Sequence, residues 1–518
     1  MTRRSPPTDG RRRLTAVLVI IALLVGAAAV DQVQGPAQAA TAPVVNRSGS
    51  PTAVAPVSAL SSSWYCQVAT AASPPAGGNG STSTTGVPKP AQAPTKSKSQ
   101  SQSKSKAPGR ARASILLANT GAAPVHGTVS TGSGRSRRSM AVTVPAMGHV
   151  LVDESKLSAA PDVAATVALD GGGVAVQQRL TGPGGTSTST SNCASAPSAH
   201  WYFASGSTAG GDQLLVSLYN PLPTSAIADL SFATDKGRFV PSDDQGIVVP
   251  GGQQVVLDVG LHVQQRPIVA THVHVRLGRL VASETEIGKA APGPGTWMAL
   301  GAPATARTWH FPAGLVAKGA GEHLDLFNPS SSPAKVKVAL GLASGSAEPI
   351  QLSVPPRSVV DLAAASQHRI PPGTLFALVV SSVNDVGIVA QRSITDTAPR
   401  GQRGRASMIG GQPARQWALA GGAASPNGWE LVVADNPGPR PATVSVVLLD
   451  GDGAAAPGLG AVVVPPGRPV LLPLSKHLTA AQRQLPMVVS STRPVLVEQD
   501  LSPAGGKGLS TVLGEPLP

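Results

Sequence analysis

The stretch SAHWYFASG, residues 198–206, places four ring-bearing side chains in a row in a chain that is only 3% aromatic. Its tryptophan, Trp201, recurs at Trp309 and Trp417, so that successive copies stand 108 residues apart. Nineteen residues after each tryptophan stands an asparagine: Asn220, Asn328 and Asn436. Fixed spacing of this kind over three copies indicates an internal repeat.

Two more landmarks keep the same register. A Val-Pro step recurs at Pro250, Pro355 and Pro465, and Glu284, Gln391 and Glu498 follow these prolines by 34, 36 and 33 residues. An earlier copy carries Trp64, Asn119, Pro145 and Gln178. Its tryptophan and asparagine are 55 residues apart because a low-complexity insert, too poor in apolar residues to fold, separates them. We therefore predict four repeats: repeat 1 at 61–185 with its insert at 71–112, repeat 2 at 195–290, repeat 3 at 303–400 and repeat 4 at 412–518.

The local pattern within a repeat is typical of β-strands. In KVKVALGL, residues 335–342, lysines alternate with valines, which puts charged and apolar side chains on opposite faces of an extended chain. Repeat 2 contains about seven such runs, and 57 glycines and 49 prolines supply turns along the chain. The predicted fold class is all-β, a tandem array of four immunoglobulin-like antiparallel β-sandwich units after one N-terminal transmembrane helix.

The start of the chain predicts export. Residues 1–13 are basic and end in three arginines, residues 14–30 are uncharged and apolar, and residues 31–60 resemble a linker. The arginines should keep residues 1–13 in the cytoplasm. We favour an uncleaved signal anchor at 14–30 over a signal peptide cleaved near AQA, residues 37–39. The expected location is the cell membrane, single-pass with an extracytoplasmic C-terminal region, or secretion if the segment is cleaved.

The net charge of +14 does not indicate a nucleic-acid partner. Residues 1–30 and 67–112 carry 11 of these charges, and the remainder of the chain is close to neutral. A nucleic-acid-binding protein concentrates its cations on a folded face. The insert at 71–112 is expected to be a solvated segment, and its alternative role is attraction to anionic polymers of the cell envelope.

Cys66 and Cys193 are the two cysteines of the chain. In an exported protein such a pair predicts a disulfide. It would tie the start of repeat 1 to its junction with repeat 2.

Few residues suggest chemistry. His272 and His274 share one face of a strand, but no third metal ligand is apparent. Glu284 and Glu286 also share a face and resemble a glycosidase pair, although a Glu or Gln recurs at this place in every repeat. Tyr202 and Tyr219 would serve carbohydrate binding if they were accessible. We predict no catalytic, metal-binding or cofactor-binding residues and no cofactor.

The Trp, Asn-Pro, Val-Pro and Val-x-[Glu/Gln] landmarks resemble those of an uncharacterised family of membrane-anchored or secreted envelope proteins of high-GC Gram-positive bacteria. The resemblance implies a β-rich fold and envelope localisation, with no catalytic residues. We predict a non-enzymatic, membrane-anchored scaffold or binding module whose partners are the membrane and either anionic envelope polymers or another envelope protein. The alternative is a cell-wall glycan-processing enzyme or a carbohydrate-binding protein.

Overall fold

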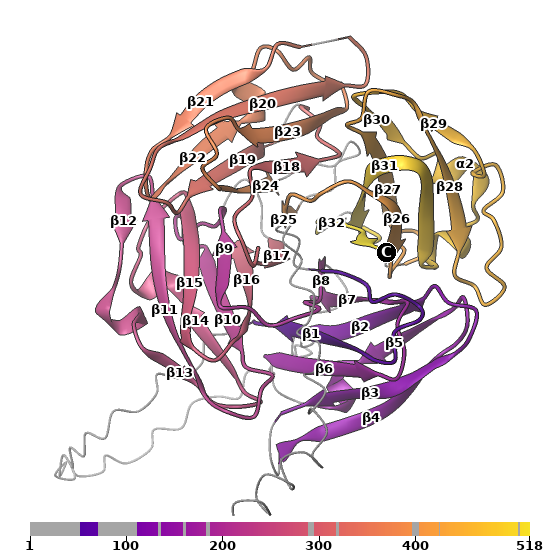
Figure 1. Ribbon diagram of the computed structural model, residues 1–518, viewed down its shortest axis with the longest axis horizontal. Coiled ribbons are helices and arrows are strands. Elements are labelled where there is room, and N and C mark those ends of the chain that lie inside the picture. Colours follow the sequence, from indigo (N-terminus) through magenta and orange to yellow (C-terminus); the bar gives the residue numbers. More distant parts are fainter. Residues whose placement is uncertain are drawn as a thin grey trace, which may run out of the picture. The chain divides into compact units, whose positions relative to one another are not determined.

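A computed structural model describes residues 52–70, 111–132, 136–158, 162–182, 187–288, 295–317, 321–345, 347–395, 404–423, 425–505 and 508–518 (Figure 1). The predicted tail, signal segment and first part of the linker lie outside these ranges, as does the insert apart from Ala111 and Arg112. The described residues form an all-β, sandwich-like fold of antiparallel sheets, which confirms the predicted class at this level.

Each repeat contributes a pair of sheets. The strands of repeat 1 are β1 (Ser62–Val68), β2 (Arg112–Asn119), β3 (Val125–Thr131), β4 (Arg138–Val144), β5 (His149–Asp153), β6 (Val163–Leu169), β7 (Val174–Thr181) and β8 (Thr188–Asn192). One sheet has the order β1-β6-β3-β4 and the other β5-β2-β7-β8. A buried apolar cluster around Trp64, Ile115 and Val167 fills the space between them.

The same order recurs in repeats 2 and 3. Repeat 2 contains β9 (His200–Phe203), β10 (Gln213–Tyr219), β11 (Ala226–Thr234), β12 (Gly237–Phe239), β13 (Ile247–Val249), β14 (Gln254–Asp258), β15 (Val269–Leu277), β16 (Val281–Gly288) and β17 (Gly295–Leu300). Repeat 3 contains β18 (Thr308–Phe311), β19 (Gly321–Asn328), β20 (Ala334–Leu342), β21 (Ile350–Val354), β22 (Ser358–Ala363), β23 (Phe376–Ser382), β24 (Val389–Thr395) and β25 (Arg405–Ile409). The extra strand β12 forms a hairpin with β11.

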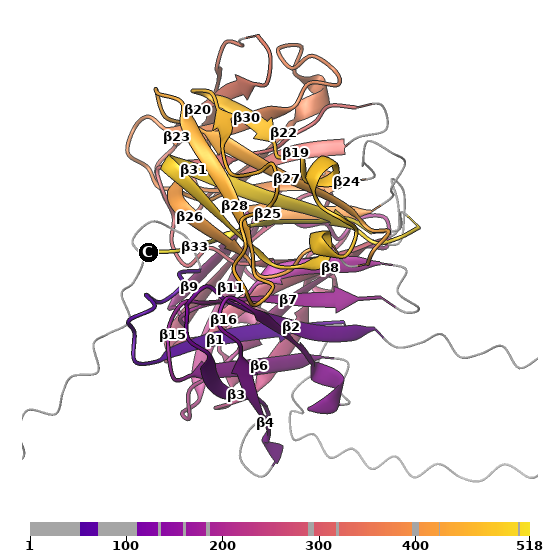
Figure 2. The same ribbon diagram turned by 90° about the vertical axis from the view of Figure 1, so that its right-hand side faces the viewer.

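Repeat 4 joins its two sheets through one long strand. Its strands are β26 (Ala414–Leu419), β27 (Trp429–Asn436), β28 (Ala442–Leu448), β29 (Val462–Val464), β30 (Arg468–Leu471), β31 (Met487–Ser502), β32 (Ser510–Leu513) and β33 (Glu515–Pro516). The first half of β31 pairs with β26 and β28, and its second half pairs with β27 and β32. Figure 2 shows β31 beside β26, β27 and β28. Strand β31 therefore corresponds to both the sixth and the seventh strand of the other repeats.

Helical structure among the described residues is brief. It comprises α2 (Leu474–His477) and the 3₁₀ turns η2 (Glu154–Lys156), η4 (Ser242–Asp244), η5 (Val259–Leu261), η6 (Ala364–Ser366) and η7 (Gln482–Gln484). Within β20 the predicted alternation holds, since Val336 and Val338 are buried while Lys335 and Lys337 are exposed.

The strand order differs from that of an immunoglobulin domain, whose sheets follow the orders ABED and CFG. In repeats 1 and 3 the second strand pairs with the fifth, and the third with the sixth, as in immunoglobulins. The first strand, however, pairs with the sixth, and the seventh with the second. The sandwich was predictable from alternation, but the immunoglobulin-like connectivity is not supported.

Each repeat ends in an eighth strand that lies beyond the predicted ranges of repeats 1 to 3. Glycine- and proline-rich linkers precede β8, β17 and β25, so the sequence pattern suggested an earlier end. The eighth strands bring the repeats together (Figure 1). β17 contacts β8 and β25, and β32 contacts β25 and β8, which closes a cycle of four strands. A cavity of about 60 Å³ lies beside them and is lined by residues of all four repeats.

The predicted membrane anchor must be corrected. Within the ranges that the structure describes, no helix is long and apolar enough to cross a bilayer. We therefore withdraw both the membrane partner and the single-pass location. The apolar segment at 14–30, on which that prediction rested, lies outside the described ranges.

Candidate functional site

The asparagine landmarks join the two sheets of each repeat. Asn328 ends β19, and its Nδ2 donates to the Ser332 carbonyl at 2.8 Å and to the Val354 carbonyl at 3.0 Å, at the end of β21 in the other sheet. Its Oδ1 accepts from the backbone N–H of Ser330 at 3.0 Å. The same set of bonds recurs at Asn119, Asn220 and Asn436. These buried asparagines are structural, and they explain why the Val-Pro step recurs with them.

The tryptophan landmarks are also part of the core. The indole N–H groups of Trp201, Trp309 and Trp417 donate to backbone carbonyls at 2.8–2.9 Å. Trp64 is equally buried, but its Nε1 has no hydrogen-bond partner among the described residues. A buried indole cannot stack on a ligand, so SAHWYFASG belongs mainly to the fold.

Strand register moves the fourth landmark in two repeats. In each repeat, the residue three before the asparagine landmark has a partner on the seventh strand. These cross-strand partners are Gln177, Ser283, Gln391 and Glu498. The landmarks predicted at Gln178 and Glu284 are therefore one residue too far along. In repeat 1 a second glutamine, Gln178, follows Gln177, and in repeat 2 Glu284 follows Ser283. Spacing in the sequence alone therefore could not decide the register.

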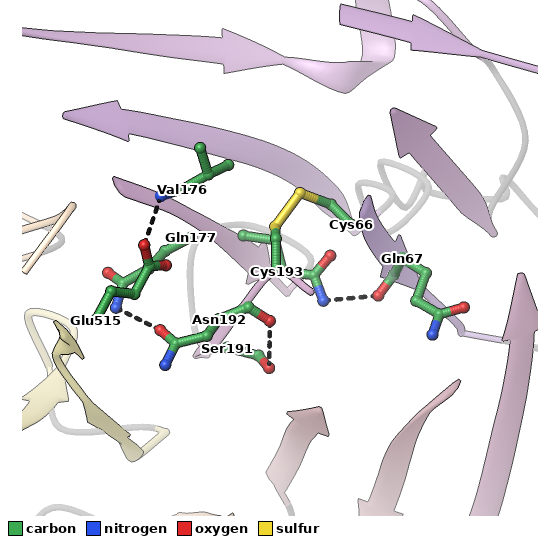
Figure 3. The surroundings of a disulfide bond; sticks show 9 residues. Cys66, Gln67, Val176, Gln177, Ser191, Asn192, Cys193 and Glu515 are labelled. Carbon is green, nitrogen blue, oxygen red and sulfur yellow. Dashed lines mark hydrogen bonds between the residues drawn. A yellow bond between two sulfur atoms is a disulfide. The ribbon is translucent and has the colours of Figure 1, made fainter. Parts of the chain in front are cut away.

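The predicted disulfide between Cys66 and Cys193 is confirmed (Figure 3). Cys66 lies on β1, and Cys193 directly follows β8 in the facing sheet, with both side chains buried in the core of repeat 1. The bond therefore closes the sandwich of repeat 1. It joins the first strand of repeat 1 to the residue after its eighth strand, at the junction with repeat 2, as expected.

In the other repeats a large side chain packed on a glycine occupies the place of the disulfide. The residues two after the tryptophan landmarks are Phe203, Phe311 and Leu419, and the residues after the eighth strands are Gly301, Gly410 and Gly514. A Cβ on these glycines would lie 2.7, 2.9 and 3.1 Å from the facing side chain. The contact thus requires glycine.

Strands β9 and β15 carry a cluster of rings. His200 faces His274 across the two strands, and Tyr202 faces His272. Tyr202 and His272 stack at 4.4 Å, and His200 Nδ1 lies 3.2 Å from His272 Nε2. Burial, together with the neighbouring imidazoles, lowers the pKa of His272 to about 3, so its ring is neutral at pH 7. The sequence did not show that His200 lies beside His272 and His274, because only the register between β9 and β15 brings the three rings together.

Among the described residues, these rings included, no group of three or more His, Cys, Asp or Glu side chains is arranged to hold a metal ion. The ring cluster is not an open sugar platform either. Tyr202 is half-buried against the neighbouring core, and Tyr219 is buried with its hydroxyl 2.7 Å from that of Thr166.

Glu284 and Glu286 lie on β16 and are both buried. Burial raises the pKa of Glu284 well above its usual value, against the smaller effect of the neighbouring Thr271 hydroxyl. Both oxygens of Glu286 are engaged, one by Arg405 Nη1 at 2.7 Å and one by the Ser207 N–H at 2.8 Å. The arrangement gives a glycan no approach to the pair.

A denser cluster of charge lies where repeats 3 and 4 meet. Arg392 on β24 is 1% exposed and binds both oxygens of Glu498 on β31, one of them at 3.3 Å from Nη1. Glu322 on β19 lies 3.8 Å from Arg392 Nε, and Asp500 on β31 also interacts with the guanidinium. Three buried carboxyl groups therefore surround one cation.

A cavity of about 210 Å³ opens beside this cluster. Among the described residues, Glu322, Arg392 and Asp500 supply its charged groups, and the rest of the lining is small or apolar. From repeat 3 come Ala313, Gly314, Leu315, Ala317, Gly373, Leu375 and Ile394, and from repeat 4 come Trp429, Leu431, Leu471 and Leu509. Leu471 remains 47% exposed and Trp429 is half-buried, so apolar surface stays open to solvent.

The charged groups of the cavity keep unused bonding capacity. Glu322 Oε1, Arg392 Nε and Asp500 Oδ1 are buried, and none has a hydrogen-bond partner among the described residues, although Glu322 Oε1 and Arg392 Nε form an ion pair at 3.8 Å. The other oxygen of Glu322 accepts from the Leu315 N–H at 2.8 Å. Burial raises the pKa of Glu322 to about 7 although Arg392 opposes this, and burial also raises the pKa of Asp500. An apolar wall with a few convergent polar groups is the usual composition of a small-molecule site.

Repeat comparison shows that the fold does not require this lining. Strand register gives the equivalent residues of repeat 3. Gly321 stands in the place of Trp429, His323 in that of Leu431 and Asp361 in that of Leu471. There His323 Nδ1 lies 2.8 Å from the Asp361 carboxylate. Likewise the place of Glu322 is taken in repeat 2 by Leu214. Nothing in the sequence pattern distinguished the cavity, because its residues come from two repeats.

One family model matches part of the chain. Residues 158–406 match the model of DUF5719, a family of unknown function, which agrees with the predicted resemblance to an uncharacterised family. No curated protein matches the chain. A solved structure of Thermotoga maritima 1070 is 22% identical, covers 20% of this chain and 93% of its own, and has a TM-score of 0.18. The Anabaena sensory rhodopsin transducer is 24% identical, covers 17% of this chain and 96% of its own, and has a TM-score of 0.15.

Proposed function

We propose that the protein is a non-enzymatic binding module of the bacterial cell envelope, and that the cavity between repeats 3 and 4 is its ligand site. The cavity carries the proposal, because its apolar wall is specific to this pair of repeats and three of its buried polar atoms lack hydrogen-bond partners among the described residues. Leaving such atoms unpaired costs about 1–3 kcal/mol each, a cost that a ligand can remove.

The buried disulfide supports a location outside the cytoplasm. Disulfides persist in oxidising compartments and are rare where thiols are kept reduced. The bond between Cys66 and Cys193 lies in the core of repeat 1, where it holds together two sheets.

The enzyme alternative receives less support from the site residues. The carboxyl pair that suggested glycan hydrolysis is buried, and Glu286 is fully engaged by Arg405 and Ser207. A general acid needs hydrogen-bond reach to its substrate. The carbohydrate-binding alternative fails in the same way, since Tyr219 is buried and Tyr202 half-buried.

The experiment is a binding titration followed by tryptophan fluorescence. Trp429 lines the cavity and is half-buried, whereas the landmark tryptophans are buried, so acrylamide should quench Trp429 preferentially. Small amphiphilic probes that enter the cavity should reduce this quenching. Leu471→Asp, which installs the residue of repeat 3, should abolish the effect, while Val463→Asp at an exposed site on β29 should not. A protein that binds no probe in the cavity would contradict the proposal.

A further inference from the structure

The polar groups of the cavity distinguish between classes of ligand. This inference rests on the proposed function, because it names what the same cavity would bind. Two of the three buried atoms without a hydrogen-bond partner, Glu322 Oε1 and Asp500 Oδ1, are acceptors, whereas one, Arg392 Nε, is a donor. The ligand should therefore bring hydrogen-bond donors. Water could also supply them, but the apolar lining favours a group that carries an apolar body with it.

The charge balance points in the same direction. Among the residues that the structure describes, Arg392 is the one cation that lines the cavity, and Glu322, Glu498 and Asp500 all interact with it. Glu498 binds the guanidinium of Arg392 through both oxygens. The positive charge of Arg392 therefore offsets the charges of Glu322 and Asp500 less effectively. Burial raises the pKa of Glu322 and of Asp500, so a ligand cation would favour their ionised forms, whereas a ligand carboxylate would oppose ionisation.

The size of the cavity limits the ligand. A volume of about 210 Å³ lies below the roughly 300–1,000 Å³ of sites for drug-sized ligands. Leucine side chains from both repeats and the Trp429 ring line it, which suits an unbranched or compact hydrocarbon body. The open side near Leu471 gives such a molecule access.

We propose that the cavity between repeats 3 and 4 binds a small primary amine with an apolar body, whose ammonium group donates to Glu322 and Asp500 while its hydrocarbon part lies against Trp429, Leu431 and Leu471. The ammonium supplies three donors and a positive charge. Hydrogen bonds to ionised carboxylates are about twice as strong as those between neutral groups.

The repeats offer an internal contrast for this assignment. Repeat 2 has Leu214 at the place of Glu322 and Glu284 at the place of Arg392. Repeat 3 presents Gly321, His323 and Asp361 where repeat 4 presents Trp429, Leu431 and Leu471. The combination of an apolar wall with two acceptors beside an arginine is therefore a property of one repeat boundary, and the sandwich forms without it at another.

The test uses n-hexylamine, 1-hexanol and hexanoate, which share a chain length and differ in the polar group. Binding to the full chain is measured by calorimetry and by protection of Trp429 from acrylamide. Hexylamine should bind at least tenfold more tightly than hexanol, and hexanoate should be weakest. From butylamine to hexylamine, affinity should rise by about fourfold per methylene if the chain is buried.

Variants separate the polar end from the apolar wall. Glu322→Gln keeps the shape of the side chain and should weaken hexylamine at least tenfold while leaving hexanol unchanged. Glu284→Gln, at a buried carboxyl of repeat 2 outside the cavity lining, is the matched control and should change neither probe. If Glu322→Gln does not fold, Leu471→Asp at the half-exposed rim carries the test, because it should weaken binding of all chain lengths.

Each outcome bears on one of the two proposals. Equal binding of the three probes, or an amine preference that survives Glu322→Gln, would overturn the assignment of an amine and leave a ligand site. Failure of all three probes to reach Trp429 would overturn the proposed function itself. Tighter binding of hexanoate would identify Arg392 as the anchor and contradict the amine.

Discussion

At the scale of single residues, the repeats show which positions carry backbone strain. The second residue after each Val-Pro proline has a positive φ: Met147 at 45°, Gly252 at 69°, Arg357 at 52° and Gly467 at 63°. This left-handed conformation costs a non-glycine residue about 1–2 kcal/mol. Two repeats meet the requirement with glycine and two do not.

We expect Arg357→Gly to raise the stability of the protein by about 0.5–1 kcal/mol, since relief of strain exceeds the extra chain entropy of glycine. Arg357 is exposed, so no packing is lost. Gly467→Ala is the reciprocal change and should destabilise by about 1 kcal/mol, because the Cβ would meet no atom and only strain acts. Unfolding midpoints of the two variants should move in opposite directions, and movement in the same direction would contradict the argument.

The buried carboxyl groups give the protein an unusual dependence on pH. Burial, with a smaller effect from Asp153, raises the pKa of Glu154 to about 8. The folded state then keeps a proton that the unfolded chain releases near pH 4.5. Stability from this group is therefore fully present below about pH 4.5 and declines as pH rises toward 8, by about 1.4 kcal/mol per pH unit.

Glu154→Gln should remove this decline. Between pH 5 and pH 7.5 the unfolding midpoint of the variant should fall less than that of the unaltered protein, and at pH 7.5 the variant should be the more stable of the two. Glu348→Gln, at an exposed carboxyl, provides the control. Parallel midpoint curves for all three proteins would show that Glu154 ionises freely in the folded state.

At the scale of elements, the disulfide and the Phe-Gly contacts are alternative ways to close one sandwich. Cys66 and Cys193 occupy the places that Phe203 and Gly301 hold in repeat 2. Since a ring over a glycine fills similar space between the same strands, the double variant Cys66→Phe, Cys193→Gly should fold. Replacing both cysteines by serine should instead cost about 2–5 kcal/mol.

Thermal unfolding with and without dithiothreitol measures the difference. The unaltered protein should lose stability on reduction, and the Phe-Gly variant should be insensitive to reductant and more stable than the double-serine variant. Equal midpoints for the two variants would mean that repeat 1 has no room for the ring. In that case the disulfide would be required by shape as well as by linkage.

Sequence reasoning recovered the elements that depend on local pattern. Alternation as in β20 identified strands, and the spacing from Trp201 to Asn220 identified repeats, because buried and turn residues recur wherever the fold recurs. It failed where pairing decides the outcome. Strand order, the eighth strands and the register at Gln177 depend on which strands meet, and no local pattern records that. The cavity beside Arg392 was missed because two repeats build it.

At the scale of residues 46–518, the cycle of eighth strands changes what a tandem repeat implies. In an open array each repeat contacts only its neighbours, and the terminal repeats are the least supported. Here repeat 4 also contacts repeat 1. The Thr190 N–H on β8 donates to the Ser510 hydroxyl on β32 at 2.7 Å, and Asn192 Nδ2 donates to the Leu513 carbonyl at 3.1 Å. The first and last repeats are therefore neighbours.

The four C-terminal residues complete this closure and provide its test. Glu515 is buried and accepts from the Val176 N–H of repeat 1 at 2.9 Å, while Leu517 packs against the core of that repeat. Deleting residues 515–518 leaves the Val176 N–H without its acceptor and exposes apolar surface, at a cost of about 2–4 kcal/mol. We expect faster amide hydrogen exchange in β7 of repeat 1 and in β26 of repeat 4, and a lower unfolding midpoint. Glu515→Gln, which keeps an acceptor in place, should preserve protection at Val176. Protection lost in β26 alone would show that the repeats are stabilised only by their neighbours in sequence, and that closure contributes nothing to stability.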